Sequence, residues 1–450
     1  MKVRFICIMF ILYLLFTGCN QNSHATPVPE TPAPATEISG KETQPPPTAE
    51  ATEPPVAEVS QVPVKDGTPA GKPGKGDIKS ISKSYTDFGF NLFSEVEKEH
   101  KGKNIFISPA SVAFALSMTG NGAEGTTGDA MAGVLQFKGM GIDEVNSLNK
   151  LLMEELSRSN SNIELSIANS LWCKPDMTFK PDFIGRCKDF YDAEVSNKFD
   201  ANAINSWVKE KTKDKISKII DKIPEEAILY LINAIYFKGT WKTEFDKKKT
   251  EDKDFFLLNG NKKKCPFMSQ RGDFSYYRGD KFQAVNLPYG DGSTGMYIFL
   301  PDEKTGLDEF QKNLTGKNWK KWMKDFRVKE GDVILPRFKI EYELLLNDSL
   351  TALGMGIAFD RLNANFRNMC EFSKEDNVYI NRVIHKTFVE VNEKGTEAAA
   401  VTAVEMGLFA TSVNPEPPDR FYMLVDHPFF FVIMDNKTGL ILFMGSVVEP

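Results

Sequence analysis

Residues 390–421 constrain the fold more than any other stretch, because their composition suits a β-strand although they are connected like a surface loop. Their first part is free of proline and rich in small, β-tolerant residues, which permits pairing along both edges. Alternation from Thr396 puts Ala398 on an apolar face and Glu397 on the opposite, charged face. A proline-rich turn at residues 413–419 then precedes the last apolar strands. We therefore expect a strand-like segment that is connected as a long surface loop, and such loops are usually functional or disordered.

Three motifs resemble a known family. Residues 393–400 (EKGTEAAA) resemble the proximal hinge of the reactive-centre loop of inhibitory serpins, and residues 428–431 (PFFF) and 442–448 (LFMGSVV) resemble that family's closing strands. The resemblance implies an α+β serpin fold at residues 77–450, with about nine helices, three β-sheets and an exposed reactive-centre loop at about residues 393–420. It implies hinge roles for Glu393, Gly395, Thr396, Glu397, Ala398, Ala399 and Ala400.

The first 76 residues predict export rather than a folded unit. Residues 1–18 have a basic start and an apolar run too short to span a membrane, which is typical of a signal peptide. Thr17-Gly18-Cys19 resembles the lipobox of a bacterial lipoprotein, in which Cys19 is lipidated; the alternative is an ordinary cleaved signal with an incidental cysteine. Residues 19–76 are rich in Pro and Thr, so we expect a disordered linker. The protein is expected to be extracytoplasmic, either lipid-anchored to the cell membrane or secreted.

Composition argues against several classes of function. The net charge of −6 argues against a nucleic-acid partner. The cysteines after the linker, Cys173, Cys187, Cys265 and Cys370, are widely spaced, so we expect free buried thiols rather than disulfides or a zinc site. The sequence contains no hydrolase, phosphate-binding or metalloprotease motif. We expect no metal, no cofactor and no catalytic residue.

Hydrophobic periodicity outlines the folded part. Residues 78–97 predict an amphipathic helix, and the nearly continuous apolar run at 228–237 predicts a strand that is covered on both faces. Residues 333–340 predict one strand whose Pro336 marks an edge or a bulge, and they resemble an inner strand of the family's large sheet. Residues 344–353 predict a late helix.

Five residues match serpin positions beneath the point where the main sheet opens, and a sixth matches the position where the loop begins to insert. The resemblance implies roles in this polar "shutter" for Asn104, Ser108, Ser111, Asn233 and His385, with a hydrogen bond between the last two, and a role for Trp241 in the "breach" where the loop begins to insert. The residues alone also permit helix capping by Ser108 or Ser111, a core role for Trp241 and a satisfied core role for His385. Asn233 requires partners, because a buried unpaired amide costs about 1–3 kcal/mol.

The resemblance further implies that a serine protease recognises the loop as a substrate. The protease attacks a backbone carbonyl group of the loop and forms a covalent acyl-enzyme. With Glu393 as the seventeenth residue before the cut, the reactive bond joins Phe409 and Ala410. If the register is shifted by one residue, Leu408 or Ala410 enters the specificity pocket of the protease in place of Phe409. Phe409 favours chymotrypsin-like or subtilisin-like targets, and the shifted register adds elastase-like enzymes. We expect a monomer whose partner is a serine protease. Cysteine proteases are a further possible class of partner.

Two alternatives remain. One is a non-inhibitory serpin that acts as a binding or chaperone protein, although the small-residue hinge is typical of inhibitory members. The other is an enzyme that uses His385 or His427. A covalent band with chymotrypsin on a denaturing gel separates these readings.

Overall fold

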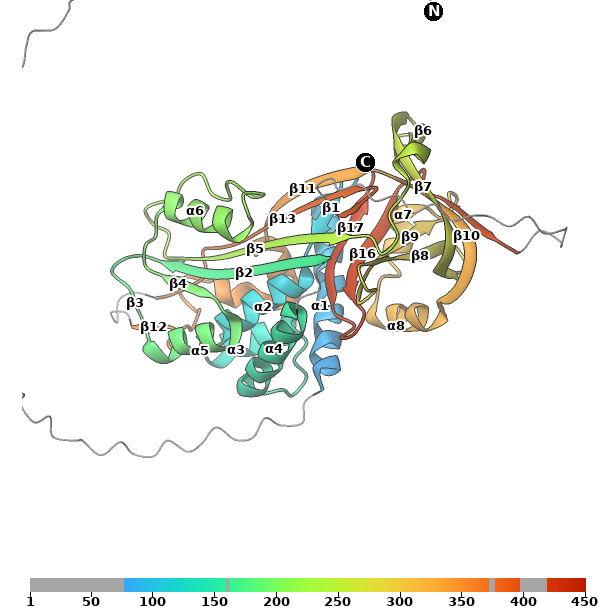
Figure 1. The fold of residues 1–450 in the computed structure, drawn as a ribbon. Coiled ribbons are helices and arrows are strands. Elements are labelled where there is room, and N and C mark those ends of the chain that lie inside the picture. The colour runs from blue at the N-terminus through green and yellow to red at the C-terminus, as the bar shows by residue number, and fades with distance from the viewer. Residues whose placement is uncertain (1–76, 159–161, 372–376, 397–418) are drawn as a thin grey trace, which may run out of the picture. The chain divides into compact units, whose positions relative to one another are not determined.

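The computed structural model describes residues 77–158, 162–371, 377–396 and 419–450. Helices and mainly antiparallel sheets make up this part of the chain, as expected of the α+β class (Figure 1). None of its helices is both long enough and apolar enough to cross a membrane. Its nine α-helices are α1 (Ile78–Glu99), α2 (Pro109–Gly120), α3 (Gly125–Val134), α4 (Ile142–Ser157), α5 (Pro181–Tyr191), α6 (Ala201–Lys211), α7 (Gly306–Gln311), α8 (Gly316–Asp325) and α9 (Asn347–Leu350).

A six-stranded sheet has the strand order β11-β13-β14-β5-β2-β4. The apolar run predicted from the sequence lies in β5, whose residues are buried from Leu229 to Phe237. Such a strand has no solvent face and must be covered on both sides. The strands of this sheet are β2 (Ile163–Cys173), β4 (Glu194–Ser196), β5 (Leu229–Thr240), β11 (Phe338–Leu345), β13 (Arg382–Asn392) and β14 (Gly395–Thr396).

Helices cover both faces of the six-stranded sheet. α2 packs against β2 and β5, and its residues are buried from Pro109 to Thr119. α6 packs against β2 on the other face, where Trp172, Ile204 and Tyr230 belong to a second apolar cluster. Figure 1 shows α6 above these strands and α2 below them. The sheet is therefore an interior layer.

A nine-stranded sheet contains the C-terminal strands and has the order β1-β17-β16-β9-β8-β7-β10-β15, with β6 paired to β7. A third sheet consists of β3 (Thr178–Phe179) and β12 (Cys370–Glu371). The strands of the nine-stranded sheet are β1 (Ile105–Ile107), β6 (Glu251–Phe256), β7 (Lys262–Arg278), β8 (Phe282–Tyr289), β9 (Thr294–Pro301), β10 (Arg327–Pro336), β15 (Phe421–Leu424), β16 (Phe429–Asp435) and β17 (Ile441–Val447).

The segment predicted as one strand at residues 333–340 is divided between two sheets. β10 ends at Pro336 in the nine-stranded sheet, and β11 begins at Phe338 in the six-stranded sheet. The prediction of an inner strand holds for β10, which lies between β7 and β15, and fails for β11, which lies at the edge of its sheet. Proline lacks the N–H that a continued ladder needs, which explains the change of sheet after Pro336. The late helix also begins later than predicted, since β11 runs to Leu345.

The four cysteines of the described residues are free and buried, as predicted. Burial raises the pKa of the Cys173 and Cys370 thiols to about 12. Both thiols are therefore protonated at neutral pH, which makes them poor nucleophiles.

Candidate functional site

The candidate site is the seam between β13 and β5. These strands are parallel and pair from Arg382 opposite Tyr230 to Thr387 opposite Ile235. Nearer the end of β13, β14 enters between them, and Thr396 pairs with Val391 of β13 and with Gly239 of β5. β14 is antiparallel to both neighbours. The seam is therefore closed along one part and divided by β14 at the other end.

A tight turn at residues 392–395 reverses the chain from β13 into the seam. The side chain of Asn392 accepts a hydrogen bond from the Lys394 N–H at 3.0 Å. The N–H groups of Trp241 and Phe245 donate to the carbonyl oxygens of Lys394 and Glu393, each at 2.8 Å. The turn is thus fixed to the segment that follows β5.

Gly395 is required by the closeness of β5. Its φ angle is +147°, a conformation that L side chains rarely adopt. A Cβ atom at this position would overlap the carbonyl oxygen of Gly239 and lie 2.8 Å from Cα of Thr240. Any other residue here would displace the backbone of β14.

A partly buried ion pair fixes the start of the hinge. Arg337 donates to Glu393 Oε1 from Nε at 2.9 Å and also from a terminal guanidinium nitrogen. The Thr250 hydroxyl donates to the same oxygen at 2.5 Å. Burial by itself would raise the pKa of Glu393, but the hydrogen bonds from Arg337 and Thr250 hold that pKa below its ordinary value. Glu393 is therefore ionised at neutral pH.

Trp241 lies directly against the hinge turn. Its indole Nε1–H donates to the Asn392 carbonyl oxygen at 2.9 Å. Its ring stacks on Tyr289, with centroids 4.4 Å apart and an interplanar angle of 12°. The Tyr289 hydroxyl is 2.6 Å from Thr396 Oγ1, within hydrogen-bond distance. The Thr396 side chain, the first one in the seam, is thus held by the stacked pair of Tyr289 and Trp241.

Ser108, Ser111, Asn233 and His385 meet at the closed part of the seam. His385 Nε2 accepts from the Ser108 N–H at 3.0 Å, so the ring proton is on Nδ1, which donates to Asn233 Oδ1 at 2.6 Å. The Asn233 amide nitrogen donates to the Ser111 carbonyl oxygen at 3.1 Å and to Asn169 Oδ1 at 2.6 Å. Burial lowers the pKa of His385 to about 3, so the ring is neutral.

These hydrogen bonds join four elements, since Asn169 belongs to β2. Asn233 belongs to β5 and His385 to β13, and the two residues face each other across the ladder. Ser108 is the N-cap of α2, and Pro109 occupies the first turn. Separation of β13 from β5 must break the bond between His385 and Asn233, whose net contribution is about 0.5–1.5 kcal/mol.

Asn104 makes its hydrogen bonds elsewhere. Its side-chain oxygen accepts from the N–H groups of Val448 at 2.7 Å and Glu449 at 3.0 Å, and its amide donates to the Glu449 carbonyl oxygen at 2.6 Å. Asn104 therefore holds the C-terminal residues beside β1, and none of these bonds reaches the seam.

Some predicted site residues lie outside the described part of the chain. They are Cys19, the hinge residues Glu397, Ala398, Ala399 and Ala400, and the reactive-bond residues Phe409 and Ala410. Within the described part, no group of side chains has the composition of a metal site.

Sequence reasoning missed three residues of the seam, namely Asn169, Tyr289 and Arg337. Asn169 faces Asn233 across the ladder of β2 and β5 and carries the same signal, an amide inside a buried strand. Tyr289 and Arg337 reach the hinge from the ends of β8 and β10. No local pattern marks them, because their partners are distant in the sequence.

Comparisons with known proteins agree with this geometry. The family model described as Serpin (serine protease inhibitor) matches residues 83–450. The leukocyte elastase inhibitor of Homo sapiens is 34% identical over 390 residues, which cover 83% of this chain and 100% of that protein. The native structure of tengpin, a thermophilic serpin, has a TM-score of 0.77 and 33% identity, covering 84% of this chain and 96% of tengpin. Human thyroxine-binding globulin has a TM-score of 0.74 and 27% identity, covering 83% and 99%.

Proposed function

The chain belongs to the serpin family, and we propose that it is an inhibitory member that traps serine proteases as a suicide substrate. The protease cleaves the loop between Phe409 and Ala410 and remains attached as an acyl-enzyme. The freed loop inserts into the six-stranded sheet and releases strain stored in the native fold. Serpin relatives of this chain are protease inhibitors and not enzymes.

The observation that carries the proposal is the position of β14. Its two residues already pair antiparallel with β13 and β5. Insertion of the following residues replaces the parallel pairing of β13 and β5 by two antiparallel ladders, which are more stable per residue. About a dozen new ladder bonds contribute on the order of 1 kcal/mol each. The native fold therefore lies above the inserted fold in free energy.

The side chains of the hinge suit this path. Thr396 is fully buried where it enters the seam. Strand alternation gives Ala398 and Ala400 the same inward direction and Glu397 the outward one. Small inward side chains pass between neighbouring strands without displacing their cores.

Insertion competes with hydrolysis of the acyl-enzyme. Fast insertion carries the protease away and distorts it before water reaches the ester, which gives a trapped complex. Slow insertion lets hydrolysis finish, which gives cleaved inhibitor and free protease. The ratio of the two products therefore measures the insertion rate relative to deacylation.

Incubation with chymotrypsin followed by a denaturing gel tests the proposal. We expect a covalent band at the summed masses, and a released C-terminal peptide that begins at Ala410 by mass spectrometry. Phe409→Glu is the matched control, because it removes the side chain read by chymotrypsin and should abolish the band. Elastase, subtilisin and papain in the same panel determine the protease class.

A second outcome would favour a different function. The similarity to thyroxine-binding globulin concerns a binding protein, and fold alone does not decide between inhibition and binding. Cleavage by every protease of the panel without any covalent band would refute the inhibitory proposal and favour the binding or chaperone role.

We also propose that the protein is exported and held at the cell membrane by lipid on Cys19, with residues 20–76 as a linker. The support is the signal-like start and the small residues before Cys19. Labelling of cells with a radioactive fatty acid should mark the protein, and Cys19→Ser should lose the label and leave the membrane fraction. A Cys19→Ser variant that keeps both would contradict the anchor.

A further inference from the structure

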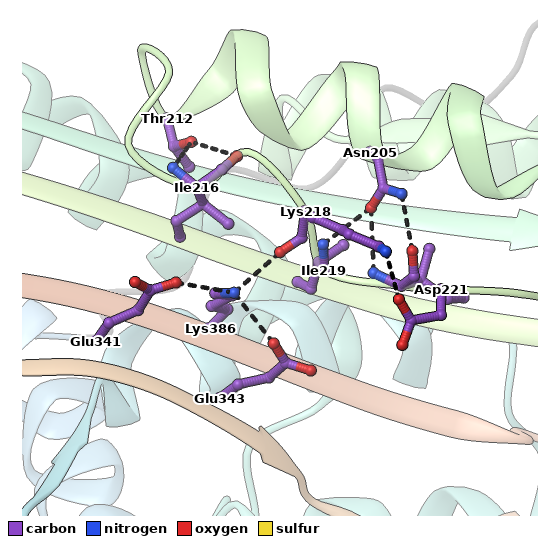
Figure 2. A network of polar contacts seen from close by, with 10 residues as sticks. Asn205, Thr212, Ile216, Lys218, Ile219, Asp221, Glu341, Glu343 and Lys386 are labelled. Carbon is purple, nitrogen blue, oxygen red and sulfur yellow. Dashed lines mark hydrogen bonds and ion pairs between the residues drawn. The ribbon is translucent and has the colours of Figure 1, made fainter. Parts of the chain in front are cut away.

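A second contact crosses the seam on the face covered by α6. Residues 212–228 connect α6 to β5, and Asn205 of α6 holds this connection by accepting from the N–H groups of Ile219 at 2.9 Å and Ile220 at 3.1 Å. Lys386 of β13 donates from Nζ to the Lys218 carbonyl oxygen at 2.9 Å (Figure 2). Because residues 212–228 continue directly into β5, this bond links the β5 side of the seam to β13.

Lys386 lies in the closed part of the seam. It faces Ala234 of β5 in the ladder, and its side chain is only 11% exposed. Its ammonium group also contacts Glu341 at 3.0 Å and Glu343 at 3.1 Å, both on β11 (Figure 2). The network therefore joins two strands on one side of the seam to the connection on the other side.

A cavity of about 380 Å³ lies beside this network, between residues 218–224 and the strands β11 and β13. Its volume is in the range of sites for small molecules. The apolar part of its lining comprises Ile219, Ile220 and Ile384 of the second apolar cluster and the exposed Leu345 of β11. An apolar group of a ligand can therefore rest here.

The charged part of the lining has an excess of cations. Four basic residues, Lys218, Lys222, Arg382 and Lys386, accompany two carboxylates, Asp221 and Glu343, which leaves two positive charges. Lys218 pairs with Asp221, and Lys386 pairs with Glu343 and also with Glu341, which lies outside the lining. Within the described residues, no ion pair joins Arg382 or Lys222 to a carboxylate, and Arg382 lies 5.7 Å from the ring centroid of Tyr230.

We propose that this cavity binds a small organic dianion with an apolar body, such as an aryl phosphate. Arg382 and Lys222 neutralise the anionic group, and Arg382 supplies the paired N–H donors that suit phosphate or carboxylate. The apolar body packs on the isoleucine side chains. Arg382 belongs to β13 and Lys222 to the connection, so the bound dianion bridges the seam.

The bridge has a consequence that rests on the proposed inhibitory function. Loop insertion must separate β13 from β5 and break the bond between Lys386 and Lys218. A dianion held by Arg382 and Lys222 adds a second contact that insertion must break. Occupancy therefore slows insertion, so that more of the inhibitor is cleaved and less is trapped with protease.

Titration calorimetry with phenyl phosphate tests the site, with phenol and inorganic phosphate as partial probes. We expect phenyl phosphate to bind at least tenfold more tightly than either probe, and Arg382→Gln with Lys222→Gln to weaken binding at least tenfold. Lys320→Gln with Lys321→Gln on α8 removes the same charge outside the cavity and should bind as the unaltered protein does. Absence of binding, or equal binding by the Arg382/Lys222 variant, would overturn the proposal.

A gel assay with chymotrypsin tests the coupling to insertion. Saturating phenyl phosphate should raise the ratio of cleaved to complexed inhibitor at least twofold in the unaltered protein and leave it unchanged in the Arg382/Lys222 variant. Chymotrypsin activity on a small substrate controls for effects on the protease. An unchanged ratio with bound ligand would refute the coupling. A protein that forms no complex without ligand would refute the inhibitory function, while calorimetry would still decide the binding site.

Discussion

At the residue scale, Gly395 is the position where one added atom has the largest effect on the hinge. A Cβ atom there meets the backbone of β5, whereas a Cβ atom at Gly133 of α3 meets nothing within 4 Å. We expect Gly395→Ala to lower the free energy of unfolding by about 1–3 kcal/mol, because β14 loses its pairing. We expect Gly133→Ala to be neutral or stabilising by up to about 1 kcal/mol. Urea denaturation measures both, and equal stability of the two variants would contradict the packing described for β14.

His385 gives a pH dependence with a definite sign. Its folded pKa of about 3 lies below the ordinary value of 6.5, so the unfolded chain binds the extra proton between these values. Stability from this group is therefore complete above pH 6.5 and is lost as the pH falls below it. Between pH 7.5 and pH 5.0 we expect a loss of about 2 kcal/mol that His385→Gln does not show. Urea denaturation at both pH values checks this, and an identical loss in the variant would contradict a neutral buried ring.

The residues of the seam differ in how far the sequence predicts them. Asn233 and His385 stand out as polar groups inside buried strands, and their need for partners follows from the cost of burying polar atoms. Which ring nitrogen of His385 carries the proton does not follow from the sequence, because this depends on the Ser108 N–H of another element. The partners of Asn104 do not follow from the sequence, because its side-chain oxygen accepts from Val448 and Glu449, which are 344 and 345 residues away.

At the scale of elements, the hinge behaves as the beginning of a strand. Thr396→Arg places a long charged side chain at a fully buried position against Tyr289. We expect this variant to be cleaved at the same bond by chymotrypsin with at least a tenfold lower fraction of covalent complex, because insertion becomes slow relative to hydrolysis. Glu397→Arg on the outward face is the matched control and should keep most of the complex. Full trapping by Thr396→Arg would show that insertion is not needed.

The same scale shows where pattern reading succeeds. The β5 run is predicted well because burial on both faces leaves an unbroken apolar signature. The division at Arg337 was not predicted, because β10 and β11 are nearly contiguous and differ only in the sheet that each one joins. Sheet membership depends on partners such as β7 and β13, which periodicity does not identify.

At the scale of the whole molecule, cleavage should increase stability. Insertion adds about a dozen residues to the interior of the six-stranded sheet, so we expect the nicked protein to melt about 20 °C higher than the intact protein or more. Differential scanning calorimetry before and after limited chymotrypsin treatment measures this. Thr396→Arg treated in the same way should gain much less. A nicked protein that melts no higher would remove the energetic basis of trapping.

The position of the last strands has a consequence for how the chain is made. β17 pairs with β1, β16 pairs with β9, and Asn104 binds Val448, so residues 429–448 complete the nine-stranded sheet. A ribosome synthesises about 5–20 residues per second, so residues 421–450 follow the loop by roughly two to six seconds. All strands of the six-stranded sheet are therefore synthesised before β15, β16 and β17, which complete the nine-stranded sheet.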